Sequence, residues 1–229
     1  MSEPDIQARW RLMLNEQQQQ QLLSDVAAMG MSLKRATDVL GAALLLLILS
    51  SLLVLIAASI KVGSRGPVLF VQQRVGRGGK PFRIYKFRTM VAQGEDALAE
   101  ALASSDNAAR EWSVYQKLAR DPRITRVGAV LRRWSLDELP QLWNVLVGDM
   151  SLVGPRPCMA SQVHLHGLHF EDYCAMRPGI TGLWQVSGRN RLTYQQRVSL
   201  DTAYVRNWSL LLDLIILLKT LREVLRGSL

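Results

Sequence analysis

The segment Ser135-Leu-Asp-Glu-Leu-Pro-Gln-Leu-Trp-Asn144 places two adjacent carboxylates, Asp137 and Glu138, in an otherwise apolar run. Arginines surround this segment in the sequence, before it and after it: Arg126, Arg132, Arg133 and Arg156. Two neighbouring acids disfavour each other's ionisation, and a divalent cation or a cluster of arginines relieves that repulsion. The segment therefore favours phosphoryl chemistry, with the two carboxylates as candidate catalytic and metal-binding groups.

A structural explanation for the same two acids stays open. Ser135 and Glu138 have the spacing of a capping box, and acids in a first helical turn are favoured by the helix dipole. Pro140 argues against Ser135 as the cap, because it would fall where a helix needs the backbone N–H that proline lacks. A helix that starts at Asp137 holds Pro140 in its first turn and places Asp137 at an end that favours phosphate.

Composition limits the function classes. The chain has 229 residues, which predicts one domain of moderate size with appendages. Its net charge of +9 indicates an anionic partner, which is anionic lipid, a phosphorylated substrate or nucleic acid. The cations lie among turns and beside acids without an evident reading helix, so we expect no nucleic-acid partner. Cys158 and Cys174 form no disulfide framework, which favours a reducing compartment.

The first third of the chain changes from polar to apolar. Residues 1–31 are polar and rich in glutamine, which predicts a weakly ordered extension. Residues 36–60 are almost continuously apolar, with Asp38 as the only charge, and are long enough to span a bilayer. A buried helix of a soluble domain is the alternative.

Cations flank both ends of this apolar segment: Lys34, Arg35, Lys61, Arg65, Arg74 and Arg77. The preference of cations for the cytoplasmic side pulls both ends to one face, which a single spanning helix cannot satisfy. A helix that is broken midway can satisfy it, and Ser50-Ser51 lies near the middle, where serine hydroxyls bend helices. We therefore expect a re-entrant membrane helix over residues 32–62.

The rest of the chain alternates short elements. Strands are predicted at 68–72 and 81–87, joined as a hairpin by a basic glycine-rich turn. Helical segments are predicted at 91–120, 127–133, 141–147 with a stop at Gly148, and 192–206. Residues 149–157 form a loop whose prolines hold Arg156 on stiff backbone. After Asn207 the pattern fits an interfacial helix and a terminal core helix equally well.

The three histidines, His164, His166 and His169, have no cysteine or acid partner at a familiar zinc spacing. We therefore expect surface histidines on a loop.

Several segments, taken in order, resemble the bacterial sugar transferases, also called monotopic phosphoglycosyl transferases. The resemblance covers residues 32–229 and is carried by Lys34-Arg-Ala-Thr-Asp38, Gly66-Pro67, Gln73-Arg-Val-Gly76, Tyr85-Lys-Phe-Arg-Thr-Met90, Asp121-Pro-Arg123, the 135–144 segment, Gly148-Asp-Met-Ser-Leu-Val-Gly-Pro-Arg-Pro157, Arg177-Pro-Gly-Ile-Thr-Gly-Leu-Trp-Gln185 and Gly188-Arg-Asn190.

The resemblance implies an α/β, mostly helical, monotopic membrane protein. Its parts are a re-entrant N-terminal helix, a small β-hairpin and amphipathic interfacial helices around a cytosolic catalytic domain at residues 63–229. It implies a place in the bacterial inner membrane, with the catalytic domain facing the cytoplasm. Many members carry Ser-Pro at the helix break, where this chain has Ser50-Ser51, and larger relatives carry further membrane helices, so we expect a minimal catalytic unit.

The resemblance also implies the reaction. Hexose-1-phosphate passes from a UDP-hexose to undecaprenyl phosphate, the first membrane step of exopolysaccharide, O-antigen or capsule synthesis. Asp137 attacks the sugar-bearing phosphate, a covalent phosphosugar intermediate forms, and UMP leaves. Glu138, with Asp137, helps to hold Mg²⁺. The sugar stays open between galactose and glucose; the segment from Glu111 to Leu118 resembles galactose-transferring members.

The candidate phosphate-binding residues are Lys86, Arg88, Arg156 and Arg189. Asp201 matches another acidic position of the family, and its role stays open. So does the oligomeric state, a homo-oligomer included.

Overall fold

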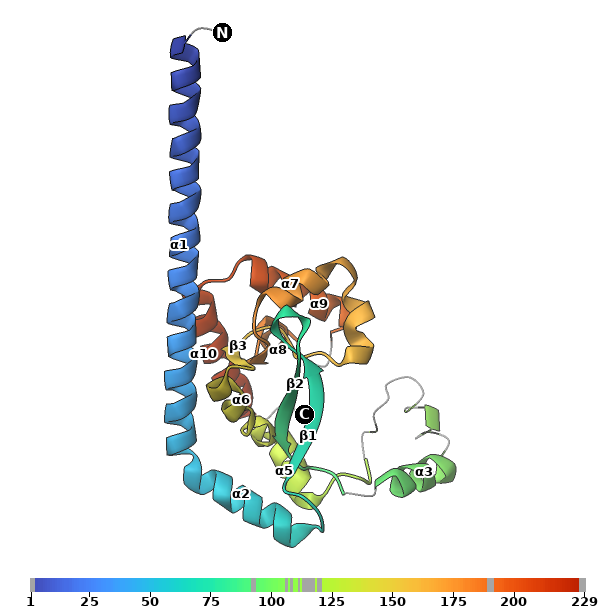
Figure 1. The fold of residues 1–229 in the computed structure, drawn as a ribbon. Coiled ribbons are helices and arrows are strands. Elements are labelled where there is room, and N and C mark those ends of the chain that lie inside the picture. Colours follow the sequence, from blue (N-terminus) through green and yellow to red (C-terminus); the bar gives the residue numbers. More distant parts are fainter. Residues whose placement is uncertain are drawn as a thin grey trace.

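The structure is a computed structural model that describes residues 3–91, 94–105, 107, 109–110, 112, 118, 121–188 and 192–226. Helices and two small sheets form a core beside one long helix, α1 (Figure 1). The elements are α1 (Glu3–Ile48), α2 (Ser50–Gly63), β1 (Leu69–Val75), η1 (Arg77–Gly79), β2 (Pro81–Phe87), α3 (Gly94–Ser104), α5 (Arg126–Arg133), η2 (Leu136–Glu138), α6 (Gln141–Val147), β3 (Ser151–Val153), η3 (Ala160–His169), α7 (Phe170–Ala175), β4 (Gly179–Thr181), α8 (Leu183–Val186), α9 (Tyr194–Arg206) and α10 (Leu210–Arg226).

The apolar segment forms a bent pair of helices. In the described part of the chain, no single helix is long and apolar enough to cross a membrane. Residues 28–48 of α1 and the whole of α2 meet that criterion together, with a bend of 63° between them. The break falls at Leu49, next to the predicted Ser50-Ser51.

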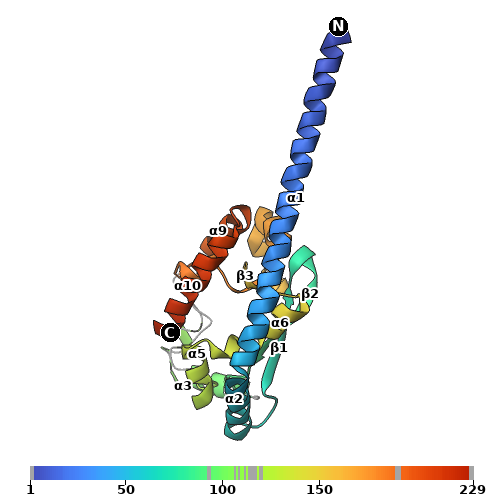
Figure 2. The same ribbon diagram turned by 90° about the vertical axis from the view of Figure 1, so that its left-hand side faces the viewer.

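The glutamine-rich segment differs from expectation. From Glu3 onward it continues α1 as helix, in place of the weak order predicted for residues 1–31. Figures 1 and 2 show that this part of α1 extends well beyond the core.

The predicted hairpin is confirmed. β1 and β2 pair antiparallel from Leu69 opposite Phe87 to Val75 opposite Pro81, so the first strand extends three residues beyond its predicted end. Gly78 and Gly79 lie in the turn with φ of 67° and 73°, a conformation that glycine adopts without a steric penalty. The glycine-rich stretch therefore closes the hairpin.

A second sheet was not predicted. β3 and β4 pair in parallel, although residues 149–157 were expected to be a loop. The two chain segments approach so closely that a Cβ on Gly154 would lie 2.4 Å from the carbonyl oxygen of Arg177. Gly154 is therefore needed for the contact, and the contact holds the following Arg156 against the 177–185 segment.

The helical turn with the two carboxylates also differs from both expectations. Ser135 has a φ of 54° and its side chain caps nothing, so the capping box was wrong. Leu136–Glu138 is a separate 3-10 turn, and α6 begins only at Gln141, after Pro140, so a helix starting at Asp137 was wrong as well. The predicted helix at 141–147 is confirmed, and it ends at Gly148 with a φ of 95°.

The histidine segment is helical and partly buried. His166 is only 4% exposed and lies 5.0 Å from Tyr173 and 5.6 Å from Tyr194, measured between ring centroids. Burial lowers its pKa. The prediction of surface histidines was therefore wrong for His166, because its ring fills an aromatic cluster.

The C-terminal helix packs on the core, as one of the two alternatives predicted. Asp213 and Ile216 of α10 are buried against the core. The other side of the helix carries exposed apolar side chains: Leu211, Leu214, Leu218, Leu221 and Leu225. α10 is therefore a core helix with an apolar outer face.

A buried ion pair fastens α1 to this core. The Lys34 ammonium donates to Asp213 Oδ2 at 2.7 Å and to the Val153 carbonyl at 3.0 Å. The same carboxylate accepts from the Tyr204 hydroxyl at 2.6 Å and from the Trp208 indole at 3.1 Å. Lys34 is 4% exposed, so its ammonium group lies in the core and binds there.

Two neighbours of Lys34 add to this fastening. Asp38 accepts hydrogen bonds from the Ser151 hydroxyl at 3.0 Å and the Leu152 amide at 2.9 Å. Arg35 donates to the carbonyls of Val145 and Leu146 at the end of α6. α1 is thereby joined to β3 and to the helix that follows the two carboxylates.

We predict that Lys34→Met destabilises the protein by about 3–5 kcal/mol, because it leaves the Asp213 charge buried and unpaired. Thermal unfolding followed by circular dichroism measures this. The double variant Lys34→Met/Asp213→Asn removes both charges and keeps one acceptor oxygen, which the Tyr204 hydroxyl can use, so it should recover part of the loss. A single variant as stable as the wild type would contradict the role of the pair.

Candidate active site

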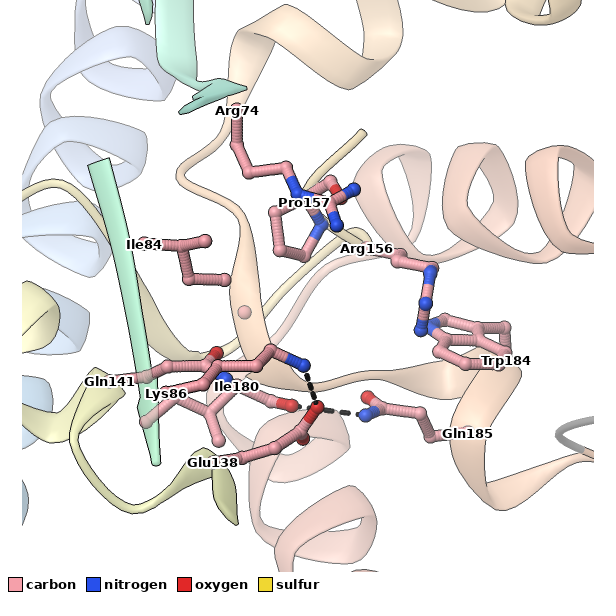
Figure 3. Close-up of a pocket in the computed structure, with 11 residues that line it drawn as sticks. Arg74, Ile84, Lys86, Glu138, Gln141, Arg156, Pro157, Ile180, Trp184 and Gln185 are labelled. Atoms are coloured by element: carbon pink, nitrogen blue, oxygen red, sulfur yellow. Dashed lines mark hydrogen bonds and ion pairs between the residues drawn. The ribbon is translucent and has the colours of Figure 1, made fainter. Parts of the chain in front are cut away.

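The site is built at the turn between α5 and α6. Ser135, in the left-handed conformation, lies between α5 and η2, and η2 carries Asp137 and Glu138. The Lys86 ammonium, from β2, lies 2.6 Å from Glu138 Oε1, and both side chains are about one-quarter exposed, at 25% and 27%. Figure 3 shows this pair inside a pocket, with Gln185 close by and Arg74 and Arg156 on another side.

Asn144 fixes the position of Lys86 relative to Glu138. It is completely buried, its amide donates to the Arg83 carbonyl at 2.6 Å, and its oxygen accepts from the Tyr85 amide at 3.2 Å. These bonds join α6 to β2. The strand that carries Lys86 is therefore held against the helix that follows Glu138.

Asp137 has the perturbed acid–base behaviour of a reactive group. Burial raises its pKa to about 6, and the neighbouring Glu138 adds to the rise, whereas Lys86 and Arg132 lower it. At neutral pH the group is ionised, yet it is more basic than an ordinary aspartate, which suits a nucleophile. Its side chain does not line the pocket, while that of Glu138 does.

The pocket has a volume of about 320 Å³ with its open mouth. Its walls come from both sheets, the turn that carries Asp137 and Glu138, and the 177–185 segment: Arg74, Ile84, Lys86, Glu138, Gln141, Arg156, Pro157, Gly179, Ile180, Trp184 and Gln185. Three cations line it, opposed by Glu138 as the only acid among these residues. Such a pocket favours an anionic ligand.

An arginine cluster surrounds Trp184. The guanidinium of Arg156 lies 4.6 Å from the centroid of the Trp184 ring system, and that of Arg197 lies 5.1 Å from it. Burial, followed by repulsion from Arg156, lowers the pKa of both Arg74 and Arg197. Arg156 therefore repels both Arg74 and Arg197, and a bound anion would offset that repulsion.

Asp201 stabilises this cluster through a hydrogen bond to the backbone of Arg156. It is 5% exposed, and its Oδ2 accepts from the backbone amide of Arg156 at 3.1 Å. Burial raises its pKa to about 7. Asp201 therefore holds the backbone that carries Arg156.

The remaining predicted residues lie apart from the pocket. Arg88 is 6% exposed and donates to Ser64 at the end of α2, with distances of 2.9 Å to the carbonyl and 2.8 Å to the hydroxyl. Arg189 lies outside the described residues, as does most of the 111–118 segment. The structure thus brings Lys86, Glu138 and Arg156 together, beside Asp137 and Asp201.

Comparison with known proteins identifies the family. The family model described as bacterial sugar transferase matches residues 29–227. The chain belongs to the bacterial sugar transferases. The predicted resemblance is thereby confirmed over nearly the whole chain.

Named relatives of this sugar transferase agree. It is 47% identical over 205 residues to the exopolysaccharide production protein ExoY of Rhizobium meliloti, covering 89% of this chain and 91% of the relative. It is 47% identical to the undecaprenyl-phosphate galactose phosphotransferase of Salmonella typhimurium, over 85% of this chain and 40% of the relative.

A third relative is the UDP-glucose:undecaprenyl-phosphate glucose-1-phosphate transferase of Caulobacter vibrioides, with 43% identity over 84% of this chain and 69% of the relative. The Salmonella and Caulobacter relatives are undecaprenyl-phosphate sugar phosphotransferases by name, which confirms the predicted enzyme class, the phosphoglycosyl transferases.

Sequence reasoning about this sugar transferase missed Arg74, Trp184 and Arg197 as site residues. Arg74 and Trp184 lie within segments that carried the resemblance, but spacing alone did not show that they meet. Arg197 lies on α9, and only the tertiary structure brings it to Trp184.

A nucleophilic Asp137 predicts that the transfer rate falls about tenfold per pH unit below about pH 6, because a carboxylate attacks only in its ionised form. Lys86→Met should move this acid limb to higher pH, since Lys86 lowers the pKa of Asp137. Lys86→Arg keeps the charge and is the matched control. The pH profile of the rate measures both, and identical profiles for the two variants would contradict the assignment.

Proposed function

We propose that the chain transfers hexose-1-phosphate from a UDP-hexose to undecaprenyl phosphate and releases UMP. The observation that carries this proposal is Asp137, with its raised pKa, next to Glu138 at a pocket lined by Arg74, Lys86 and Arg156. The names of the relatives support both substrates. The product, a polyprenyl-diphospho-hexose, would begin the synthesis of an exopolysaccharide or a related surface polymer.

The reaction proceeds in two displacements at one phosphorus atom. A carboxylate oxygen of Asp137 attacks the phosphorus that carries the hexose, and the bond to the UMP oxygen breaks. The acyl phosphate that forms on Asp137 is reactive toward a second nucleophile. An oxygen of the lipid phosphate then attacks the same phosphorus, and the electron pair returns to Asp137.

The charged side chains around the pocket serve the first displacement. The guanidinium of Arg156, stiffened by its stacking on Trp184, and that of Arg74 bind the diphosphate oxygens and stabilise the charge that develops on UMP. Lys86 holds Glu138 in the pocket through their ion pair. Arg189 stays a proposed phosphate-binding residue on the family resemblance.

The donor set fits Mg²⁺. The described residues contain no group of three or more histidine, cysteine, aspartate or glutamate side chains that could hold a metal. Mg²⁺ needs no such group, because it binds through one or two carboxylates, waters and substrate phosphates. Glu138, with Asp137, would hold it, and when bound it neutralises diphosphate charge.

The membrane placement is part of the same proposal. Residues 28–48 and α2 would enter and leave the cytoplasmic face of the inner membrane as a re-entrant pair, which the 63° bend supports. The apolar outer face of α10 would lie in the interface. A water-soluble sugar nucleotide and a lipid phosphate can meet only at that plane.

We predict that Asp137→Asn lowers UMP release from UDP-galactose or UDP-glucose by about 10³-fold or more, because an amide cannot form the acyl phosphate. The assay contains undecaprenyl phosphate and Mg²⁺ and is scored by UMP. Asp172→Asn, which changes an acid paired with the exposed Arg206, is the control and should keep full activity.

Glu138→Gln is the companion variant in the same assay. It should raise the Mg²⁺ concentration needed for half-maximal rate, and an unchanged requirement would count against metal binding there. Full activity of Asp137→Asn would refute the proposed nucleophile.

A further inference from the structure

Buried polar atoms without a hydrogen-bond partner gather at two places in the described part of the chain. One group lines or adjoins the pocket and comprises Arg74 Nε, Gln141 Nε2, Trp184 Nε1, Arg197 Nε and Asp201 Oδ1. The other group is a single residue, Arg88, with both Nε and Nη1 unpartnered. Folded proteins rarely leave such groups unsatisfied, and those that remain often mark a ligand site.

A ligand in the pocket cannot satisfy the two unpartnered nitrogens of Arg88, because Arg88 does not line the pocket. It follows the last residue of β2, two positions after Lys86, and its guanidinium is bonded only to the oxygens of Ser64. No carboxylate in the described residues forms an ion pair with it, although its side chain is more than nine-tenths buried. A buried guanidinium without an acidic partner is costly unless an anion binds it.

Apolar surface and the end of α2 lie next to Arg88, which suits a phosphate that carries a hydrocarbon chain. Ser64 caps α2, the second half of the bent apolar pair. Phe87, next to Arg88, packs with Ile56 and Ile60 of α2 in one apolar cluster. Exposed apolar side chains lie close in sequence to these contacts: Val62 (89% exposed), Leu69 (39%) and Phe70 (48%). Leu69 pairs directly with Phe87.

We propose that Arg88 binds the phosphate of the polyprenyl acceptor, at a place separate from the pocket that binds the sugar nucleotide. The unpartnered Nε and Nη1 donate to the phosphate oxygens, and the hydrocarbon chain lies along the apolar surface of α2 and the start of β1. The two nitrogens are covered by protein in this structure, so the turn that carries Ser64 moves aside when the acceptor enters.

The proposal of two separate phosphate-binding places rests on the proposed function and adds an order of binding to it. The donor occupies the arginine pocket, Asp137 takes the phosphohexose, and UMP leaves. The acceptor phosphate, held by Arg88 on the side of α2, then forms a new P–O bond as the bond to Asp137 breaks. Each phosphate therefore approaches Asp137 with its own arginine.

The test separates the two half-reactions. Exchange of labelled UMP into UDP-galactose or UDP-glucose, each tried without any acceptor, reports on the donor half alone. Full transfer to undecaprenyl phosphate in detergent reports on both halves. Exchange by the wild type tests the covalent step itself, independently of Arg88; without it, the proposed covalent function fails whatever the variants do.

We predict that Arg88→Met exchanges UMP within about threefold of the wild type, while the KM for undecaprenyl phosphate rises about tenfold to a hundredfold, the loss expected for a charge-assisted hydrogen bond. Arg156→Met is the comparison variant and should lose exchange and transfer together, because Arg156 serves the donor half. Arg88→Lys keeps the charge without the planar fork, and it serves if the methionine variant does not fold, which thermal unfolding checks.

An unchanged acceptor KM in Arg88→Met, or a parallel loss of exchange and transfer in a folded Arg88→Lys, would overturn the assignment.

Discussion

The buried pair of Lys34 and Asp213 is the constraint on which the arrangement of this molecule depends. It fixes α1 to α10 and β3, while Asp38 binds the backbone of β3 and Arg35 caps the end of α6. α6 starts three residues after Glu138. Hydrogen bonds within the protein thus fix the bent helix pair relative to the turn that carries Asp137 and Glu138. A membrane anchor held in this way would present the carboxylates at a fixed depth and angle.

Cationic crowding is the second organising feature. Arg156 lies close enough to Arg74 and Arg197 for its charge to lower the pKa of both, and the cluster is held by stacking, carbonyls and one buried acid. The fold therefore maintains an unfavourable cluster that an anion would relieve, as preorganised catalytic sites do. Opposing charges also act on Asp137. Burial and the neighbouring Glu138 raise its pKa, whereas Lys86 and Arg132 lower it.

The sequence predicted the elements whose signals are local. Gln141–Val147 begins after a proline and ends at a glycine, and the hairpin has two strands around a glycine turn, so both were found. β3 and β4 have three residues each, too few for a periodic pattern, and they form because Gly154 lets two distant segments meet. His166 looked exposed because nothing local shows the tyrosines that cover it.

The candidate site could be predicted to the same degree. Asp137, Glu138 and the arginine of Gly-Pro-Arg-Pro were singled out because charged residues in apolar or proline-rich stretches stand out, and the structure places Glu138 and Arg156 at one pocket. Arg197 and the left-handed Ser135 were not, because one depends on helix packing and the other on a backbone angle. Lys34 and Arg35 were read as charges that flank a membrane segment, whereas the structure uses both to bind the core.

The most direct measurement is the mass of the intact protein after incubation with UDP-galactose or UDP-glucose and Mg²⁺ in the absence of a lipid acceptor. A covalent mechanism predicts a gain of one phosphohexose, located by peptide mapping on Asp137 and lost when undecaprenyl phosphate is added. Product formation by an enzyme that never carries this mass, or an adduct on another residue, would contradict it.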